Sequence, residues 1–398
     1  MSVYRIPSVV SLLLLLLLLS VRGVMGQETE RPRARDLGIT VGIFSTGTHN
    51  AITDVDGVLV GQVSVVEGDR IRTGVTAIRP HGGSIYAERV PAAIYVGNGF
   101  GKMIGVTQVR ELGELETPIL LTCTLCVWKA ADAMVEWALA QPGMERVGSL
   151  NAVVGETNDG GLNDIRSRPI RPEHVVQALE EASSGPVEEG SVGAGTGTRA
   201  FGWKGGIGTS SRVLPESLGG FTVGVLVQSN FGGILSMAGA PVGQELGRYS
   251  FQRSVNPARR DEAGADWLDQ DDEGQGSIMM VIATDAPLSP RSLERLAKRA
   301  IMGLARTGSF AGNGSGDYVI AFSTAQSVRR RQGEDMRMVE DLPNSRMSAL
   351  FEAVVEGTEE AIYNSILKAT TVTGMGNTAD ALPIAETTEI LRKYNVIR

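Results

Sequence analysis

The bond between Gly276 and Ser277 is the place in this 398-residue sequence where residue types most directly suggest chemistry. If that bond is cut, Ser277 gains a free α-amine, a group whose pKa is ordinarily about 7.7–8.0. Such an amine can take the proton from its own serine hydroxyl, directly or through a water molecule, and so act as the base for a nucleophile. Glycine before the serine minimises crowding when the hydroxyl attacks the preceding carbonyl group. These two residues therefore predict a serine nucleophile that needs no histidine.

The setting of this bond distinguishes it from the five other Gly–Ser pairs, at 83–84, 148–149, 190–191, 308–309 and 314–315. The segment Ser254–Gly276 is rich in Asp and Glu and has few apolar residues, so it predicts an exposed loop. The following segment, Ser277–Thr284, is almost entirely apolar and predicts a buried central strand. An ordinary junction of a loop with a strand remains the alternative interpretation.

Other features argue against histidine, metal or nucleotide chemistry. His49, His81 and His174 lie far apart and lack HExxH spacing, so neither a zinc centre nor a Ser-His-Asp triad is expected. The glycine-rich segments Gly97–Lys102 and Gly193–Thr198 fit neither the dinucleotide fingerprint nor the GxxxxGK[ST] phosphate loop. We expect no cofactor and no metal, and interpret both segments as loops whose backbone closely approaches a site. A formal charge of −8 argues against a nucleic-acid partner.

The two cysteines, Cys123 and Cys126, have Cys-x-x-Cys spacing inside an apolar segment. A metal site of this type needs a second pair, which the sequence lacks. The main interpretation is two small buried residues, and a local disulfide is the alternative.

The elements that must position these residues alternate between strands and helices. Apolar residues at three- and four-residue spacing predict helices over Val127–Leu139, after the N-cap Ser289, and after Pro343. Apolar, β-branched runs predict strands at Ala93–Val96, Asn151–Val154, Phe221–Gln228, Ile278–Thr284 and Tyr318–Ser323, and Asp56-Gly57 has the composition of a hairpin turn. The pattern indicates a layered α/β or α+β sandwich.

The first 26 residues predict a secretory signal peptide. Arg5, the leucine run Leu12–Leu19 and the small residues Val24 and Gly26 form its three parts. The apolar stretch is shorter than the roughly 20 residues that span a bilayer. We therefore expect residues 1–26 to be removed and residues 27–398 to be exported, periplasmic or secreted, without a membrane partner.

Several separate motifs resemble the L-aminopeptidase D-Ala-esterase/amidase family, which includes the β-peptidyl aminopeptidases. The resemblance covers about residues 36–398 and rests on Asn50–Val58, Glu156–Ile165, Val227–Gly232, Gly276-Ser277 and Arg306–Asp317. It implies a four-layer αββα sandwich like that of N-terminal nucleophile hydrolases but with different connectivity. It also implies self-cleavage into an α chain, 27–276, and a β chain, 277–398, and a homo-oligomer of αβ units, a tetramer.

The activity that the resemblance implies is that of a serine aminopeptidase or amidase. Its substrates would be short peptides, amino-acid amides or esters with a free amino group, β-peptides and D-Ala derivatives among them. Ser277 would be the nucleophile for self-cleavage and turnover, and Asn230 would donate to the developing oxyanion. Ser315 and Asp317 would orient the amine of Ser277 or relay a proton. Without the resemblance, Asn230 and the Ser315–Asp317 segment would be interpreted as turn residues.

Substrate binding is implied for Glu156 and Asn158, with the carboxylate pairing with the substrate's ammonium group. The alternative for Glu156 is a salt bridge to an arginine. The family often carries an aromatic residue within Glu156–Ile165, where this chain has Gly161. The source of a second oxyanion donor is therefore open, and the pocket is either wider or completed by another loop.

Two alternatives to an aminopeptidase remain at the level of sequence. One is an acyltransferase of the ornithine acetyltransferase type, which also cleaves itself but uses threonine as its nucleophile. The other is a secreted binding protein in which the Gly276–Ser277 bond stays intact.

Overall fold

The larger of two main sheets holds the Gly276–Ser277 junction at the start of a central strand. The computed structural model describes residues 30–256 and 276–398, and the fold lies within Pro32–Arg398. The strand order in this sheet is β13-β3-β12-β11-β10-β9, with β4 paired to β3. The bounds are β3 Glu88–Gly99, β4 Glu114–Leu115, β9 Gly206–Val213, β10 Thr222–Phe231, β11 Gly276–Thr284, β12 Ser315–Ser323 and β13 Arg330–Arg331. Strand β11 is antiparallel to β10 and parallel to β12.

A smaller sheet of four strands, in the order β1-β2-β5-β6, packs against the larger one. Its strands are β1 Leu59–Glu67, β2 Ile71–Arg79, β5 Ile119–Cys123 and β6 Val153–Thr157. The hairpin β1–β2 turns at residues 68–70, so Asp56-Gly57 lies before the first strand and the hairpin turn expected there was wrong.

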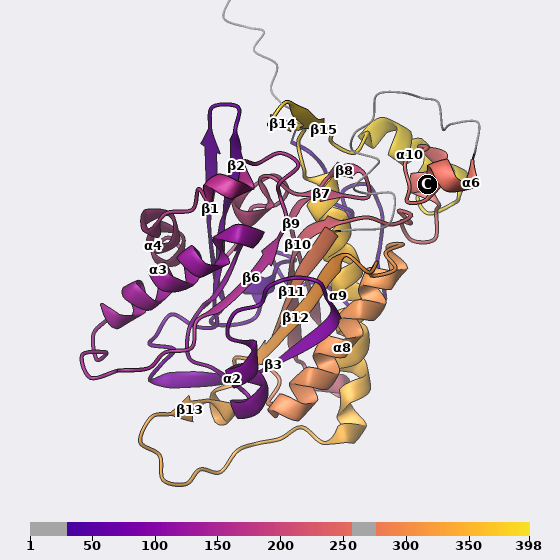
Figure 1. Cartoon of the computed structure of the whole chain (residues 1–398). Coiled ribbons are helices and arrows are strands. Elements are labelled where there is room, and N and C mark those ends of the chain that lie inside the picture. The colour runs from indigo at the N-terminus through magenta and orange to yellow at the C-terminus, as the bar shows by residue number, and fades with distance from the viewer. Residues whose placement is uncertain (1–29, 257–275) are drawn as a thin grey trace, which may run out of the picture. The chain divides into compact units, whose positions relative to one another are not determined.

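Helices cover the outer faces of both sheets, as Figure 1 shows. Helices α8 (Pro290–Arg306) and α9 (Met347–Leu367) pack on the large sheet, and α3 (Val127–Leu139) and α4 (Pro172–Glu180) pack on the small one. Three apolar clusters fill the spaces between these four layers. The αββα sandwich expected from the family resemblance is therefore confirmed.

Shorter elements connect these layers. The short helices are α2 Val106–Leu112, α5 Val242–Glu245, α6 Gln252–Val255 and α10 Ile384–Lys393. The short strand pairs are β7 Arg199–Ala200 with β8 Trp203–Lys204, and β14 Val372–Gly374 with β15 Asn377–Ala379. Within the described residues, no helix is long and apolar enough to cross a membrane.

The expected elements are present, with shifted ends. The expected strand Phe221–Gln228 runs from Thr222 through Phe231, and the expected strand Tyr318–Ser323 begins three residues earlier, at Ser315. The turn interpretation of both segments was therefore wrong, because their main chains pair with neighbouring strands. Ser289 does precede α8, but its side chain makes no capping hydrogen bond. Most of the expected loop Ser254–Gly276 lies outside the described residues.

Candidate active site

Gly276 has a backbone conformation that few residues with a side chain adopt. Its φ is +132°, and a Cβ atom there would lie 2.2 Å from the carbonyl oxygen of Asn230 and 2.6 Å from Cα of Phe231. Both neighbours are backbone atoms of the paired strand β10, so they cannot rotate away as a side chain would. The fold therefore requires glycine immediately before Ser277.

Ser277 faces the smaller sheet. Side chains alternate along a strand, and Met279 and Val281, two and four residues further on, pack between the sheets. Ser277 is 4% exposed, and its Oγ accepts a hydrogen bond of 3.2 Å from the backbone N–H of Gly316 on β12. This contact fixes the oxygen while leaving the hydroxyl proton free to be transferred.

A pocket of about 390 Å³ opens at this end of the strand. Four predicted site residues line this pocket: Ser277 from β11, Asn230 from β10, Glu156 from β6, and Asn158, the residue after β6. The remaining lining residues are Phe100, Lys102, Thr124, Gly160, Gly161, Ile165, Gly197, Arg199, Gly276 and Gly314. The fold thus gathers the predicted nucleophile, oxyanion donor and both predicted substrate-binding residues in one pocket.

The side-chain amide of Asn230 is held in one orientation. Asn230 lies directly opposite Ser277 in the β10–β11 ladder. Its Oδ1 accepts the backbone N–H of Arg199 at 2.9 Å, and its Nδ2 donates to the carbonyl oxygen of Asn158 at 3.1 Å. An amide nitrogen carries two protons, so one donor remains beyond the bond to Asn158. This arrangement suits donation to an oxyanion that forms next to Ser277.

Ser315 and Asp317 lie beside the junction on β12 and do not line the pocket. Ser315 is opposite Gly276 and Asp317 is opposite Ile278 in the parallel ladder. By strand alternation they share the face of Val319, which packs beneath the helices. Ser315 Oγ donates to Asp317 Oδ1 at 2.7 Å, and Oδ2 is buried without a hydrogen-bond partner in the described structure. Burial raises the pKa of Asp317 to about 6, although the bond from Ser315 opposes this shift.

Glu156 is paired with a lysine, where an arginine was the alternative considered from the sequence. Its Oε1 accepts the backbone N–H of Lys102 at 2.8 Å and lies 3.7 Å from Lys102 Nζ. Lys102 Nζ in turn donates to Thr124 Oγ1 at 2.7 Å. Burial raises the pKa of Glu156, and the contacts with Lys102 and Thr124 act in the opposite direction.

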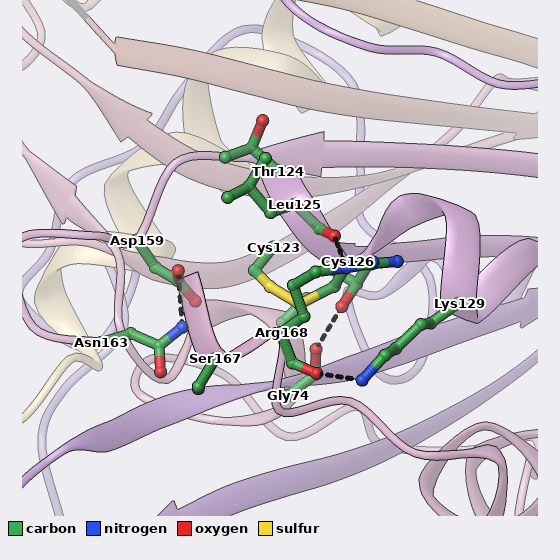
Figure 2. The surroundings of a disulfide bond; sticks show 12 residues. Gly74, Cys123, Thr124, Leu125, Cys126, Lys129, Asp159, Asn163, Ser167 and Arg168 are labelled. Atoms are coloured by element: carbon green, nitrogen blue, oxygen red, sulfur yellow. Dashed lines mark hydrogen bonds between the residues drawn. A yellow bond between two sulfur atoms is a disulfide. The ribbon is translucent and has the colours of Figure 1, made fainter. Parts of the chain in front are cut away.

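A disulfide bond joins Cys123 and Cys126 on either side of Thr124 and Leu125, as Figure 2 shows. Both cysteines are buried. Cys123 ends β5 and pairs with Thr157, the residue after Glu156, on β6. The disulfide therefore closes the turn that carries Thr124 into the pocket wall.

Glycine-rich loops approach the site closely, as their sequences predicted. A Cβ atom on Gly101 would lie 3.1 Å from Glu156 Oε1, and one on Gly197 would lie 1.9 Å from the carbonyl oxygen of Arg72. The first loop also brings Phe100 and Lys102 to the pocket. Phe100 supplies an aromatic side chain from a different segment, in the pocket where Gly161 also lies. The Gly97–Lys102 motif signalled a close backbone approach, but nothing in it identified Lys102 as the partner of Glu156.

Metal ligands do not gather in the part of the chain that the structure describes: it has no group of three or more His, Cys, Asp or Glu side chains able to hold an ion.

The four-layer αββα sandwich, with a serine at the head of a central strand, places the chain in the fold class of the Ntn hydrolases. The sequence profile of Peptidase family S58 matches residues 50–379, and the chain belongs to this family.

Similar proteins cover nearly the whole chain. The β-peptidyl aminopeptidase BapA of Sphingosinicella microcystinivorans is 44% identical over 386 residues, which is 92% of this chain and 93% of the relative. A β-aminopeptidase structure from Burkholderia sp. has a TM-score of 0.81 at 40% identity, covering 91% of this chain and 99% of that one. The L-aminopeptidase D-Ala-esterase/amidase of Ochrobactrum anthropi, described as a new variant of the Ntn hydrolase fold, has a TM-score of 0.82 at 36% identity, covering 92% and 100%.

These similarities confirm the family resemblance and the expected activity. The protein is a hydrolase, an S58 aminopeptidase/amidase that acts on peptide substrates. They give no support to an acyltransferase or to a non-catalytic binding protein.

Proposed function

We propose that this protein cleaves its own Gly276–Ser277 bond and then uses Ser277 as an N-terminal nucleophile to release amino-terminal residues from short peptides and amides. The observation that carries the proposal is the shared pocket, in which Ser277 lies opposite Asn230 and near the carboxyl group of Glu156. In self-cleavage, Ser277 Oγ attacks the Gly276 carbonyl carbon and the C–N bond breaks. The resulting ester is hydrolysed by water, which leaves a Gly276 carboxylate and a free Ser277 amine.

Turnover would then use the new amine as the base. Ser277 Oγ attacks the substrate's amide carbon while its proton passes to the α-amine. The remaining Nδ2 proton of Asn230 stabilises the oxyanion, and the stored proton moves to the leaving nitrogen. Water hydrolyses the aminoacyl ester and frees the serine. Ser315 lies opposite Gly276 and would orient the amine, and Asp317 would hold Ser315 through their hydrogen bond.

Glu156 would select substrates with a free amino group. Oε1 is engaged by Lys102, whereas Oε2 is buried and has no hydrogen-bond partner in the described residues. A buried carboxylate oxygen without a donor is costly, and a substrate ammonium group supplies both the donor and the opposite charge. The similarity to a β-peptidyl aminopeptidase of Sphingosinicella and to a β-aminopeptidase of Burkholderia supports β-amino-acid residues as substrates here.

A denaturing gel and an activity assay test this proposal together. The wild-type chain should give bands of about 26 and 13 kDa, in proportion to the shares of residues 27–276 and 277–398 in the 42.2 kDa chain. Ser277→Ala should give one uncut, inactive chain, because both steps need the same hydroxyl group. Efficient processing of the alanine variant would remove Ser277 from the mechanism.

Export and assembly complete the proposal. Residues 1–26 are proposed as a signal peptide that directs the protein to the periplasm or the medium, and the αβ units are proposed to form a homotetramer. The Cys123–Cys126 disulfide supports an oxidising compartment. Amino-terminal sequencing of the exported protein should start at Gln27, and light scattering should give the mass of four αβ units. A retained leader or a monomeric mass would contradict the respective part.

A further inference from the structure

The carboxylate proposed to bind the substrate's amine already has a cation of the protein beside it. Lys102 contacts Glu156 Oε1 twice, through its backbone N–H at 2.8 Å and through Nζ at 3.7 Å. Thr124 accepts a hydrogen bond from Nζ at 2.7 Å and so holds the ammonium in place. Both contacts fall on Oε1, and no described residue forms a hydrogen bond with Oε2.

The positions of the two side chains differ. The side chain of Glu156 is 2% exposed, whereas that of Lys102 is 41% exposed. A carboxyl group buried this deeply tends to hold its proton unless a positive charge or hydrogen-bond donors stabilise the ionised form. Only the ionised form attracts an ammonium group, so the contacts that keep Glu156 ionised also decide how well it can bind an amine.

The other ionisable groups around Glu156 do not replace Lys102. Asp159 and Tyr318 interact electrostatically with Glu156, and an ionised Asp159 opposes a second negative charge nearby. Arg199 lines the same pocket, and the ion pair that Glu156 forms in the described structure is with Lys102. Of the residues that the structure describes, Lys102 is thus the cation in direct contact with the carboxylate.

We propose that Lys102 is a positioning residue for specificity: by holding Oε1 it keeps Glu156 ionised and oriented, and it leaves Oε2 for the ammonium group of the substrate. The inference rests on the proposed role of Glu156. It adds that selection for a free amine depends on a pair of residues, one from the loop after β3 and one from β6.

The test measures amine selectivity as a function of pH. Selectivity is the ratio of kcat/KM for an aminoacyl p-nitroanilide to that for the matching desamino acyl p-nitroanilide. Both substrates need the same nucleophile and base, so titration of the Ser277 amine cancels in this ratio. We compare wild type with Lys102→Met, Lys102→Arg, Glu156→Gln and the double variant Lys102→Met/Glu156→Gln. Lys298→Met is the matched control, because the side chain of Lys298 is 42% exposed and pairs with Glu294 on α8.

Lys102→Met should lower the selectivity ratio about tenfold near neutral pH, the loss that follows when the pKa of a carboxyl group moves one unit above the assay pH. Its selectivity should also require a higher pH than that of wild type. Lys102→Arg should restore most of the ratio, and Lys298→Met should behave as wild type. The double variant should be no less selective than Glu156→Gln alone, because both changes act through one carboxylate.

The outcomes separate this inference from the proposed function. If the wild type has no preference for the free amine, the role of Glu156 itself fails. If wild type and Glu156→Gln behave as proposed but Lys102→Met keeps the wild-type ratio and pH dependence, only the role of Lys102 is overturned. Gel analysis of self-cleavage confirms that each variant has folded, since processing needs no ammonium ligand.

Discussion

In the proposed mechanism, Ser277 carries out bond breaking and the carboxyl group of Glu156 recognises the substrate, and both residues line one pocket. Ser277 is held by one backbone N–H, whereas Glu156 is held by a lysine from a different loop. Because the two residues come from different sheets, a change at one need not disturb the position of the other. Single substitutions can therefore separate self-cleavage from substrate selection.

Glu156→Gln should lower kcat/KM for free-amine substrates and leave the Gly276–Ser277 cut intact. Removing one partner of a desolvated charge pair typically costs about 2–5 kcal/mol. The measurement is kcat/KM for an amino-acid p-nitroanilide and its N-acetyl counterpart, with a gel to confirm processing. Wild-type hydrolysis of both substrates at equal rates would show that the enzyme does not require a free amine.

Asn230→Ala should reduce kcat about 10²–10³-fold, the usual cost of losing one oxyanion donor. It should also slow self-cleavage, which passes through a similar oxyanion at the same serine. Time courses of both reactions provide the measurement. Asn230 also bonds to Arg199 and Asn158, so KM should be followed to reveal a displaced loop. Unchanged rates of both reactions would exclude Asn230 as a donor.

Asp317 should make the folded chain less stable as pH rises from about 4 to 6. Burial raises the pKa of Asp317 from 3.8 to about 6, so the folded chain holds this proton over a range where the unfolded chain has released it. The unfolding free energy then falls with rising pH, by up to about 3 kcal/mol in total, and is flat above that range. Asp317→Asn should remove this part of the slope.

Urea unfolding of the uncut Ser277→Ala chain, with and without Asp317→Asn, gives the difference at each pH. Asp132→Asn makes the same chemical change at an exposed position on α3 and serves as the control. A difference between the two chains that does not change between pH 4 and pH 6 would contradict the assignment.

At the scale of elements, the pairing of β10 with β11 determines where the site can form. Nine residue pairs run from Val223–Thr284 to Phe231–Gly276, and the pocket lies at the Gly276 end. The ladder brings Asn230 opposite Ser277 and places backbone atoms of β10 against Gly276.

Gly276→Ala should prevent normal formation of this strand end. A Cβ atom 2.2 Å from the Asn230 carbonyl oxygen cannot be accommodated, and a φ of +132° is strained for alanine. We expect little or no self-cleavage and a lower melting temperature for the uncut chain. Comparison with Gly148→Ala, where a Cβ would meet no atom within 4 Å, controls for the substitution itself. Normal processing of Gly276→Ala would show that the junction adopts another conformation before cleavage.

The sequence predicted the apolar centres of these elements better than their polar ends. The apolar pattern is interrupted at Gln228, Ser229 and Asn230, so the expected strand stopped at Gln228. In the structure the backbones of these residues continue the ladder with the neighbouring strand, and their side chains are hydrogen-bonded. Ser315-Gly316-Asp317 has the composition of a turn and forms a strand for the same reason. Local pattern cannot show that a distant strand supplies main-chain partners.

The Lys102–Glu156 pair was beyond prediction for a related reason. Glu156 lies on β6 of the smaller sheet, and Lys102 lies in the loop that follows β3 of the larger sheet. Their contact depends on how the sheets pack. Only the glycines around Phe100 signalled that this loop must approach another part of the chain closely.

At the scale of the whole molecule, the proposed cut would divide the protein within its large sheet. Strands β3, β9 and β10 would belong to the α chain, and β11 and β12 to the β chain. Helices α8 and α9 of the β chain pack on strands of the α chain. We therefore expect the two fragments to stay associated after cleavage.

Size-exclusion chromatography in native buffer should give one peak containing both fragments. The same sample in 6–8 M urea, a range that unfolds most small proteins, should give two. Separation of the fragments without denaturant would contradict a shared sheet in the mature enzyme.

The proposed cut before β11 would also change the molecularity of folding. The uncut chain folds in a unimolecular reaction, because β10 and β11 are tethered to each other. Once the tether is cut, an unfolded enzyme must bring two separate polypeptides together, so the refolding yield depends on their concentration. Folding would then be independent of protein concentration only before self-cleavage. After self-cleavage, unfolding followed by dilution would make the loss of structure irreversible in practice.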